Sequence, residues 1–176
     1  MTVNSPDLAT WITSRTGFRF YVRPATARDE STIKEFFTHV SRADLRFRFL
    51  ATMDKISPDQ ISMLVHPDHE FSESFVAFGT DGSTMIASGM LACDDAFDHG
   101  EVAIVIRQDH KGRGVGWELL AYIARLAETK GLKTLESIES RDNHDAIELE
   151  RHMGFVAHGC PGDPSLIVVS RSLGHA

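Results

Sequence analysis

Three glycines alternate with other residues over positions 111–116, which read Lys-Gly-Arg-Gly-Val-Gly, and this segment constrains the chain more than any other. The preceding residues 101–106 are mostly β-branched, which is typical of a strand buried on both faces. Residues 117–129 follow with apolar side chains at helical spacing. Glycines let a backbone approach a ligand closely, and a helix N-terminus presents N–H groups to an anion. Because Lys111 and Arg113 add positive charge, the sequence predicts a phosphate site at this connection.

The glycine spacing excludes two common nucleotide-binding loops. A Walker loop requires Gly, four residues and then Gly-Lys-Ser/Thr, and no segment matches it. A dinucleotide-binding fingerprint requires a further glycine where this chain has Val115 or Trp117. A tight connection without a ligand is the alternative, but three glycines, two cations and a helix start together favour a phosphate ligand. The predicted ligand-binding residues of the loop are Lys111, Gly112, Arg113, Gly114, Val115 and Gly116.

Composition narrows the class of protein. A chain of 176 residues has the length of one ordinary domain, and its net charge of −7 argues against nucleic acid as a partner, since that binding depends on neutralising phosphates. No apolar run approaches the ~20 residues of a membrane span, and Asp7 and Arg15 interrupt any signal-peptide core. The two cysteines, Cys93 and Cys160, are too few for a disulfide framework. We therefore expect a cytoplasmic protein with reduced thiols and no membrane partner.

Apolar patterning predicts the organisation of the chain. Residues 1–17 are expected to form an N-terminal extension, in which Leu8, Trp11 and Ile12 have helical spacing, and residues 18–176 are expected to form one domain. The expected strands cover residues 18–22, 74–78, 85–92, 101–106, 134–140, 155–158 and 166–170, and the expected helices cover about 26–40, 41–51, 57–65, 117–129 and 146–153. This order predicts an α/β chain (an α+β mixed sheet), because a doubly wound fold would alternate regularly.

Two sequence blocks resemble the GNAT N-acetyltransferase superfamily. Residues 111–116 resemble its pyrophosphate loop, Arg/Gln-x-x-Gly-x-Gly/Ala, with Lys111 as a conservative departure at the first position. Residues 143–155 are similar to its block Asn-x-x-Ala-Ile-x-Leu-Tyr followed by Gly-Phe. Within the superfamily, residues 41–50 and 101–112 are most similar to the acetyltransferase domain of bacterial Pat-type protein lysine acetyltransferases.

The resemblance implies a fold and a co-substrate. The fold would be a central, mostly antiparallel mixed sheet of about six to seven strands flanked by helices. The co-substrate would be acetyl-CoA, with its pyrophosphate on the glycine loop. Its pantetheine arm would bind along Ile104, Val105 and Ile106, which agrees with the expectation that a strand parting from its neighbour offers unpaired N–H and C=O groups. Asn143 would be a further polar contact, although an N-cap is an equally good interpretation of that residue.

The resemblance also implies a catalytic residue. Acetyl transfer needs a neutral amine, and a lysine with a pKa near ~10.4 is only about 0.1% neutral around pH 7.4, so a base or a proton-relay water is required. The glutamate that matches Glu101 is the general base in the Pat-like family, and a solvated carboxylate at a strand end is the alternative. Where many family members have a tyrosine, this chain has Glu150. We expect Glu150 to be turned away from a forming thiolate, and we assign it no catalytic role.

The sequence leaves the acceptor open. A protein lysine is the leading acceptor on the resemblance alone. The alternative functions are a small-molecule amine acetyltransferase and a non-catalytic module that senses acyl-CoA. A homodimer is a further expectation. No metal site is expected, because His66 with His69, and His144 with His152, lack further ligands at suitable spacing. A packed helix face with exposed arginines explains Arg48 and its basic neighbours.

Overall fold

An eight-stranded sheet is the frame of the structure, a computed structural model that describes residues 8–51 and 53–174. The strands lie in the order β1-β2-β3-β4-β5-β6-β8-β7, and every neighbouring pair is antiparallel except β5 with β6. The strands are β1 (Thr10–Thr13), β2 (Arg19–Pro24), β3 (Ser72–Phe78), β4 (Met85–Cys93), β5 (His99–Ile106), β6 (Thr134–Ser140), β7 (Val156–Gly159) and β8 (Leu166–Ser172). The helices are α1 (Glu30–Phe37), α2 (Arg42–Phe49), α3 (Pro58–Val65), α4 (Val115–Thr129) and α5 (His144–His152), with short 3-10 turns η2 (Ala27–Asp29) and η3 (Gln108–His110). The predicted mixed, mostly antiparallel α/β fold is confirmed.

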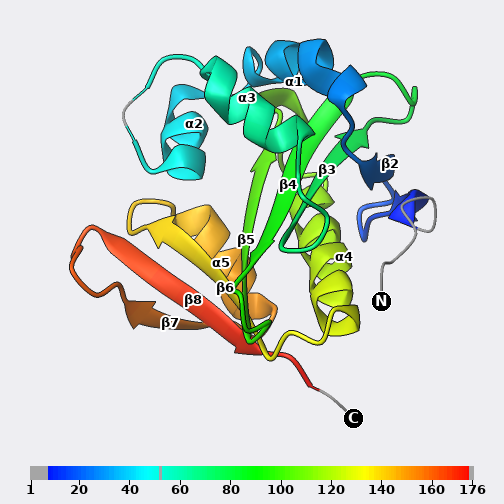
Figure 1. Ribbon diagram of the computed structural model, residues 1–176. Helices are drawn as coiled ribbons and strands as arrows, with labels where there is room; N and C mark the ends of the chain where they lie inside the picture. Colours follow the sequence, from blue (N-terminus) through cyan, green and yellow to red (C-terminus); the bar gives the residue numbers. More distant parts are fainter. Residues whose placement is uncertain (1–7, 52, 175–176) are drawn as a thin grey trace.

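Helices cover both faces of the sheet (Figure 1). α4 packs on one face, where Leu119 is fully buried, and Leu149 of α5 packs against the same apolar core. α1, α2 and α3 cover the other face around a second core that contains Phe36. The two cores meet in β5, since Val102 belongs to the first and Val105 to the second. β5 is therefore the central strand of the packing as well as of the sheet.

Local sequence signals explain where the helices begin. Ser41 accepts a hydrogen bond from a backbone N–H at the start of α2, and Ser57 and Gln60 form a reciprocal capping box at the start of α3. α4 begins at Val115, two residues before the predicted start, because Gly114 takes the N-cap position with a φ of 83°. The glycine loop therefore runs directly into the helix.

The first described segment forms a strand. β1 pairs antiparallel with β2 along its whole length, and the ring centroid of Trp11 lies 5.3 Å from that of Tyr21. The segment is a strand although Leu8, Trp11 and Ile12 have helical spacing, because cross-strand packing outweighs a weak local pattern. β1 also raises the number of strands to eight, above the expected six to seven. Residues 1–7 of the predicted N-terminal extension lie outside the described residues.

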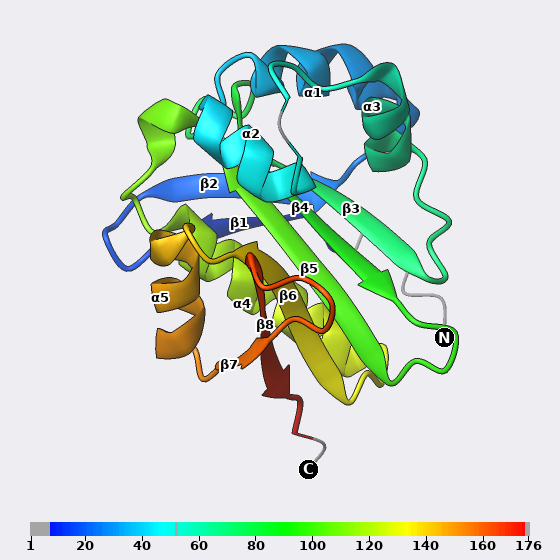
Figure 2. The same ribbon diagram turned by 90° about the vertical axis from the view of Figure 1, so that its left-hand side faces the viewer.

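β5 and β6 part soon after they meet. They pair over three residues, and Glu101 opposite Glu136 is the last pair. β6 then continues beside β8, whereas β5 continues beside β4 as far as Ile106. Within the described part of the chain, the side of residues 102–106 that faces β6 therefore has no strand partner. α2 and α5 flank this opening (Figure 2).

We predict that Gly100→Ala destabilises the protein by about 1–3 kcal/mol, because a core overpacked by one methyl group must shift. A Cβ at position 100 would lie 2.6 Å from Leu132 Cδ1 and 3.0 Å from Leu91 Cδ1, and both leucines are fully buried. Chemical denaturation measures the loss. Gly159→Ala is the matched control in β7, since no atom lies within 4 Å of its Cβ position. Equal free energies of unfolding for the two variants would contradict the prediction.

Candidate functional site

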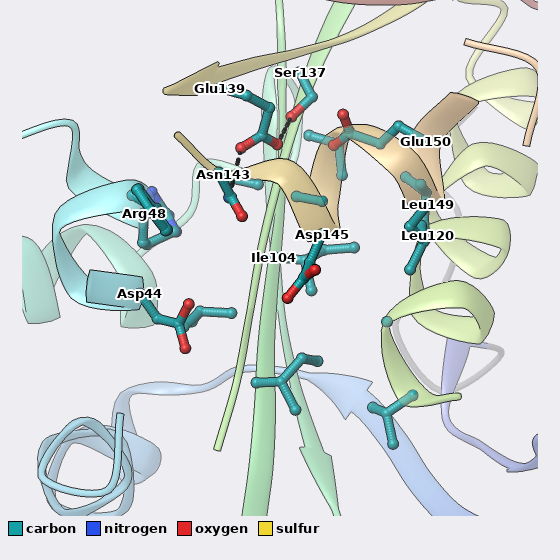
Figure 3. A pocket seen from close by; sticks show the side chains of 18 of the residues that line it. Asp44, Arg48, Ile104, Leu120, Ser137, Glu139, Asn143, Asp145, Leu149 and Glu150 are labelled. Atoms are coloured by element: carbon teal, nitrogen blue, oxygen red, sulfur yellow. Dashed lines mark hydrogen bonds between the residues drawn. The ribbon is translucent and has the colours of Figure 1, made fainter. Parts of the chain in front are cut away.

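A cavity of about 440 Å³ occupies the opening between β5 and β6. Its walls come from α2, β5, the glycine loop with the first turn of α4, β6 and α5 (Figure 3). Ten of the eleven residues proposed from sequence line it: Glu101, Ile104, Val105, Ile106, Lys111, Gly112, Gly114, Val115, Gly116 and Asn143. The fold thus brings the glycine loop, the open edge of β5 and the start of α5 to one place, whereas ligand binding by these residues stays a prediction.

The face of β5 that was expected to be buried is part of the cavity wall. Val102 and Val105 are buried, but Ile104 and Ile106 are only half-buried and Glu101 is exposed. The expectation of burial on both faces is therefore wrong. The reason is that β6 leaves after Glu101, so the β-branched side chains beyond it line an opening instead of a core.

Arg113 is the one proposed residue outside the cavity. Its guanidinium lies over the ring of Phe18, 5.2 Å from the centroid, and its carbonyl oxygen accepts hydrogen bonds from Ser14 and Thr16. The positive charge that the sequence placed in the loop therefore comes to the cavity from Lys111, whose ammonium forms an ion pair with the carboxylate of Asp44 on α2.

The backbone of the loop is shaped for an anion. Gly112 and Gly114 have φ values of 78° and 83°, which glycine adopts without strain. Gly114 is followed directly by α4, whose N-terminus has no side-chain cap. The first N–H groups of a helix lack partners within the helix and carry the positive end of its dipole. The cavity therefore offers free N–H donors and a lysine at one end.

Glu101 and Arg48 line the same cavity from opposite elements. Glu101 keeps contact with solvent, but partial desolvation at the cavity wall raises its pKa. The positive charge of Arg48 lowers that pKa, and the charge of Glu136 adds to the rise. Burial also lowers the pKa of Arg48, while Glu101 raises it. The Arg48 Nε atom is shielded from solvent and has no hydrogen-bond partner among the residues that the structure describes, and one terminal nitrogen lies 3.8 Å from the sulfur of Met90. Arg48 was expected to be exposed on α2, and that expectation is wrong.

A second acidic group lies on the β6 and α5 side (Figure 3). Glu139 accepts hydrogen bonds from Ser137 Oγ at 2.7 Å and from Asn143 Nδ2 at 3.0 Å. Asn143 does occupy the N-cap position of α5, but its side chain caps no backbone N–H. The residue thus orients its amide against Glu139 at the cavity wall.

Glu150 lies beside Glu139 and lines the cavity. The residue is buried, and burial together with the hydrogen bond and negative charge of Glu139 raises the pKa of Glu150 well above its usual range. The raised pKa favours the neutral form of the Glu150 carboxyl at neutral pH. The expectation that Glu150 is turned away from a forming thiolate stays a prediction. It assumed an ionised carboxylate, whereas a neutral carboxyl does not repel an anion.

Sequence reasoning missed Arg48, Asp44 and Glu139, although two of them left a signal. Glu139 continues the alternation of buried residues along β6 that begins with Leu135, so a carboxylate falls on the inner face of a strand. Arg48 follows the buried Leu45 by three residues on α2, which puts both on one helix face. The pairing of Asp44 with the loop depends on tertiary packing and has no local signal.

Metal binding, a membrane span and a cysteine nucleophile have less support among residues 8–51 and 53–174. No group of three or more His, Cys, Asp or Glu side chains there is placed to hold a metal ion, and no helix has the length and hydrophobicity of a bilayer span. Cys93 and Cys160 are free thiols. Burial raises the pKa of Cys93, so this thiol is protonated at neutral pH and is not an activated nucleophile.

Comparisons with known proteins agree on one family. A sequence model described as the acetyltransferase (GNAT) family matches residues 37–155. An acetyltransferase of Pseudomonas aeruginosa, PA5475, is 26% identical over 154 residues, which are 86% of this chain and 83% of that protein.

Solved structures share the fold. The GNAT domain of S. lividans PAT superposes with a TM-score of 0.88 at 21% identity, over 97% of this chain and all of that one. The spermidine N-acetyltransferase of Vibrio cholerae, in complex with CoA and spermine, superposes with a TM-score of 0.71 at 18% identity, over 88% of this chain and 95% of that one. At these identities the likeness concerns the fold.

We predict that Glu150→Gln stabilises the protein, and more so at pH 8 than at pH 5. The folded-state pKa of Glu150 lies above its unfolded value, so the folded state binds the extra proton and wild-type stability falls as pH rises above about 4.3. Glutamine removes this loss and still donates an N–H to Glu139. We expect thermal unfolding to show a gain in Tm of about 2–6 °C at pH 8 and a smaller gain at pH 5.

Glu148→Gln is the control, since Glu148 is exposed on the same helix. A difference in Tm between Glu150→Gln and wild type that does not change with pH would show that Glu150 is ionised in the folded state.

Proposed function

The chain belongs to the acetyltransferase (GNAT) family, and we propose that it transfers an acetyl group from acetyl-CoA to an amine, with a protein lysine as the leading acceptor. One observation carries the proposal. The opening between β5 and β6 places an unpaired strand edge, an uncapped helix N-terminus and a carboxylate with a raised pKa in one cavity. The strand edge suits the pantetheine arm, the helix N-terminus suits the pyrophosphate, and the carboxylate suits the proton of the attacking amine.

The cavity fits acetyl-CoA along its length. The unpaired backbone of residues 102–106 would hydrogen-bond the amide groups of the pantetheine arm. The N–H groups of Gly114, Val115 and Gly116 would bind the pyrophosphate, with Lys111 as the nearby cation. Asn143 would add a polar contact from the start of α5. In this arrangement the acetyl group lies toward Glu101.

Glu101 would accept the proton of the attacking amine. Its raised pKa makes it a stronger base than a glutamate with the ordinary pKa, while the charge of Arg48 limits that rise. The amine nitrogen forms the bond to the acetyl carbon, the carbon–sulfur bond breaks, and the thiolate takes a proton from water. Glu150 does not oppose the departure of the thiolate, since it is neutral.

The acceptor is proposed from likeness and from charge. The sequence resemblance of residues 41–50 and 101–112 to Pat-type protein lysine acetyltransferases favours a protein lysine, and the fold agrees with the S. lividans PAT domain over nearly the whole chain. The net charge of −7 suits a cationic acceptor. The Vibrio cholerae protein of the same fold is a spermidine N-acetyltransferase, so a small amine is the second candidate. We further propose that the enzyme acts in the cytoplasm, and we retain a homodimer as a prediction.

The first experiment is titration calorimetry with acetyl-CoA, with NAD and ATP as controls. We expect saturable binding of acetyl-CoA alone, followed by acetylation of lysines when the enzyme is incubated with a cell lysate. Absence of acetyl-CoA binding would contradict the whole proposal. Turnover of spermidine or another free amine without lysine acetylation would select the small-molecule alternative, and binding without any turnover would select the sensing module.

We predict that Glu101→Gln lowers turnover by about 10²–10⁴-fold and leaves the affinity for acetyl-CoA nearly unchanged, because glutamine retains the shape but cannot take a proton. Steady-state kinetics and calorimetry measure the two effects. Glu148→Gln is the control, since Glu148 is exposed on α5 and does not line the cavity. Unchanged turnover in the Glu101 variant would remove this residue from the mechanism.

Asp44 and a bound pyrophosphate would compete for Lys111. We predict that Asp44→Asn tightens acetyl-CoA binding by about 2–10-fold at low ionic strength, and that the gain shrinks as salt screens the charges. Calorimetry at two salt concentrations measures it. Asp54→Asn is the control, because Asp54 pairs with Arg42 on the exposed side of α2 and carries the same charge. Equal affinities of the Asp44 variant and wild type would indicate that Lys111 does not contact the phosphates.

A further inference from the structure

We propose that Ser14, Arg15 and Thr16, in the turn between β1 and β2, are positioning residues for the phosphate-binding loop. They would hold the backbone around Gly114 in its anion-binding conformation before the ligand arrives. These residues lie outside the segment 37–155 that matches the family. The inference rests on the proposed binding of acetyl-CoA. It gives a functional role to residues 14–16, for which the sequence analysis proposed none.

Two hydroxyl groups of the turn converge on one carbonyl oxygen of the loop. Ser14 Oγ donates to the carbonyl of Arg113 at 2.7 Å, and Thr16 Oγ1 donates to the same oxygen at 2.8 Å. Ser14 is itself fixed, because its Oγ accepts from the backbone N–H of Phe18 at 3.2 Å and the residue is only 5% exposed. A backbone carbonyl with two hydroxyl donors is strongly constrained in direction.

The peptide bond between Arg113 and Gly114 couples the direction of the Arg113 carbonyl to the direction of the Gly114 N–H. A trans peptide is planar, so its C=O and N–H point in opposite directions. When the Arg113 carbonyl points to Ser14 and Thr16, the N–H of Gly114 points away from the turn. Gly114 lines the cavity, and its φ of 83° sets the direction of the N–H groups that open α4. The two hydroxyls therefore fix the orientation of the proposed pyrophosphate donors.

Contacts on both sides of Gly114 support the same arrangement. The Arg15 guanidinium lies 3.5 Å from the ring centroid of Trp117, in the first turn of α4. A Cβ at position 114 would lie 3.0 Å from Ser14 Cβ, so turn and loop are in close contact. The turn thus holds the residue before Gly114 and the helix after it. A loop ordered in advance binds more tightly, since less conformational freedom is lost on binding.

The test compares two donors that differ in the group that the loop would bind. Acetyl-pantetheine lacks the pyrophosphate that acetyl-CoA carries. We expect the double variant Ser14→Ala with Thr16→Val to weaken CoA binding in calorimetry by about 5–30-fold and to raise the KM for acetyl-CoA by a similar factor. The KM for acetyl-pantetheine and both kcat values should not change, because the β5 edge and Glu101 are untouched.

Two further variants keep the test independent of folding. Thr16→Val alone changes an exposed side chain and should give a smaller loss of CoA affinity, whereas Thr16→Ser keeps the hydroxyl and should restore it. Thr13→Val is the matched control, since Thr13 is exposed on β1 next to the turn.

The outcomes separate this inference from the proposed function. Absence of CoA binding by the wild-type protein would overturn both. Binding by the wild type that is equal in the double variant would overturn the positioning role alone. Equal losses for acetyl-CoA and acetyl-pantetheine would also overturn it, because they would indicate a general structural role.

Discussion

The site depends on how weakly β5 is joined to β6. β5 has seven pairs with β4, and β6 has seven pairs with β8, but β5 and β6 have only three with each other. The sheet therefore consists of two ribbons joined at one end, and the wedge between them opens where their pairing stops. Backbone groups that would otherwise be satisfied within the sheet face this wedge. α2 and α5 form its sides, and the glycine loop begins one short turn after β5 ends, so every part of the cavity derives its position from this divergence.

Three pairs of charged or titratable groups line different parts of the cavity, and the electrostatic surroundings differ from one pair to the next. At the loop, Asp44 balances Lys111 where an anion is expected. Where the strands part, Glu101 and Arg48 face the cavity without forming an ion pair, so burial and opposite charge act against each other on the pKa of the carboxyl. On the α5 side, burial and the neighbouring Glu139 raise the pKa of Glu150 and favour its neutral form. Carboxyl groups of one cavity thus differ in pKa, because the surroundings of each group differ.

Much of the fold could be predicted from the sequence, since long periodic segments and capping residues are local signals. Ser41 and Ser57 mark helix starts that the structure contains, and the alternating strands fall close to their predicted positions. β1 was missed because four residues with one aromatic carry little pattern, and its pairing with β2 decides its conformation. The site residues on β5, the loop and α5 were identified because they lie in motifs. Arg48, Glu139 and the protonated state of Glu150 were not, since burial of a charged group follows from which elements meet in space.

The bond between Ser14 and the Arg113 carbonyl joins residues 99 positions apart. During synthesis at about 5–20 residues per second, the turn leaves the ribosome about 5–20 s before its partner does. β1 and β2 can pair early because they are neighbours in sequence, whereas the contact with the loop must wait until residue 113 has been synthesised. Closing so long a chain segment also has an entropic cost that local contacts avoid. The contact between the turn and the glycine loop is therefore among the last to form, and its presence distinguishes completely folded chains from partly folded ones.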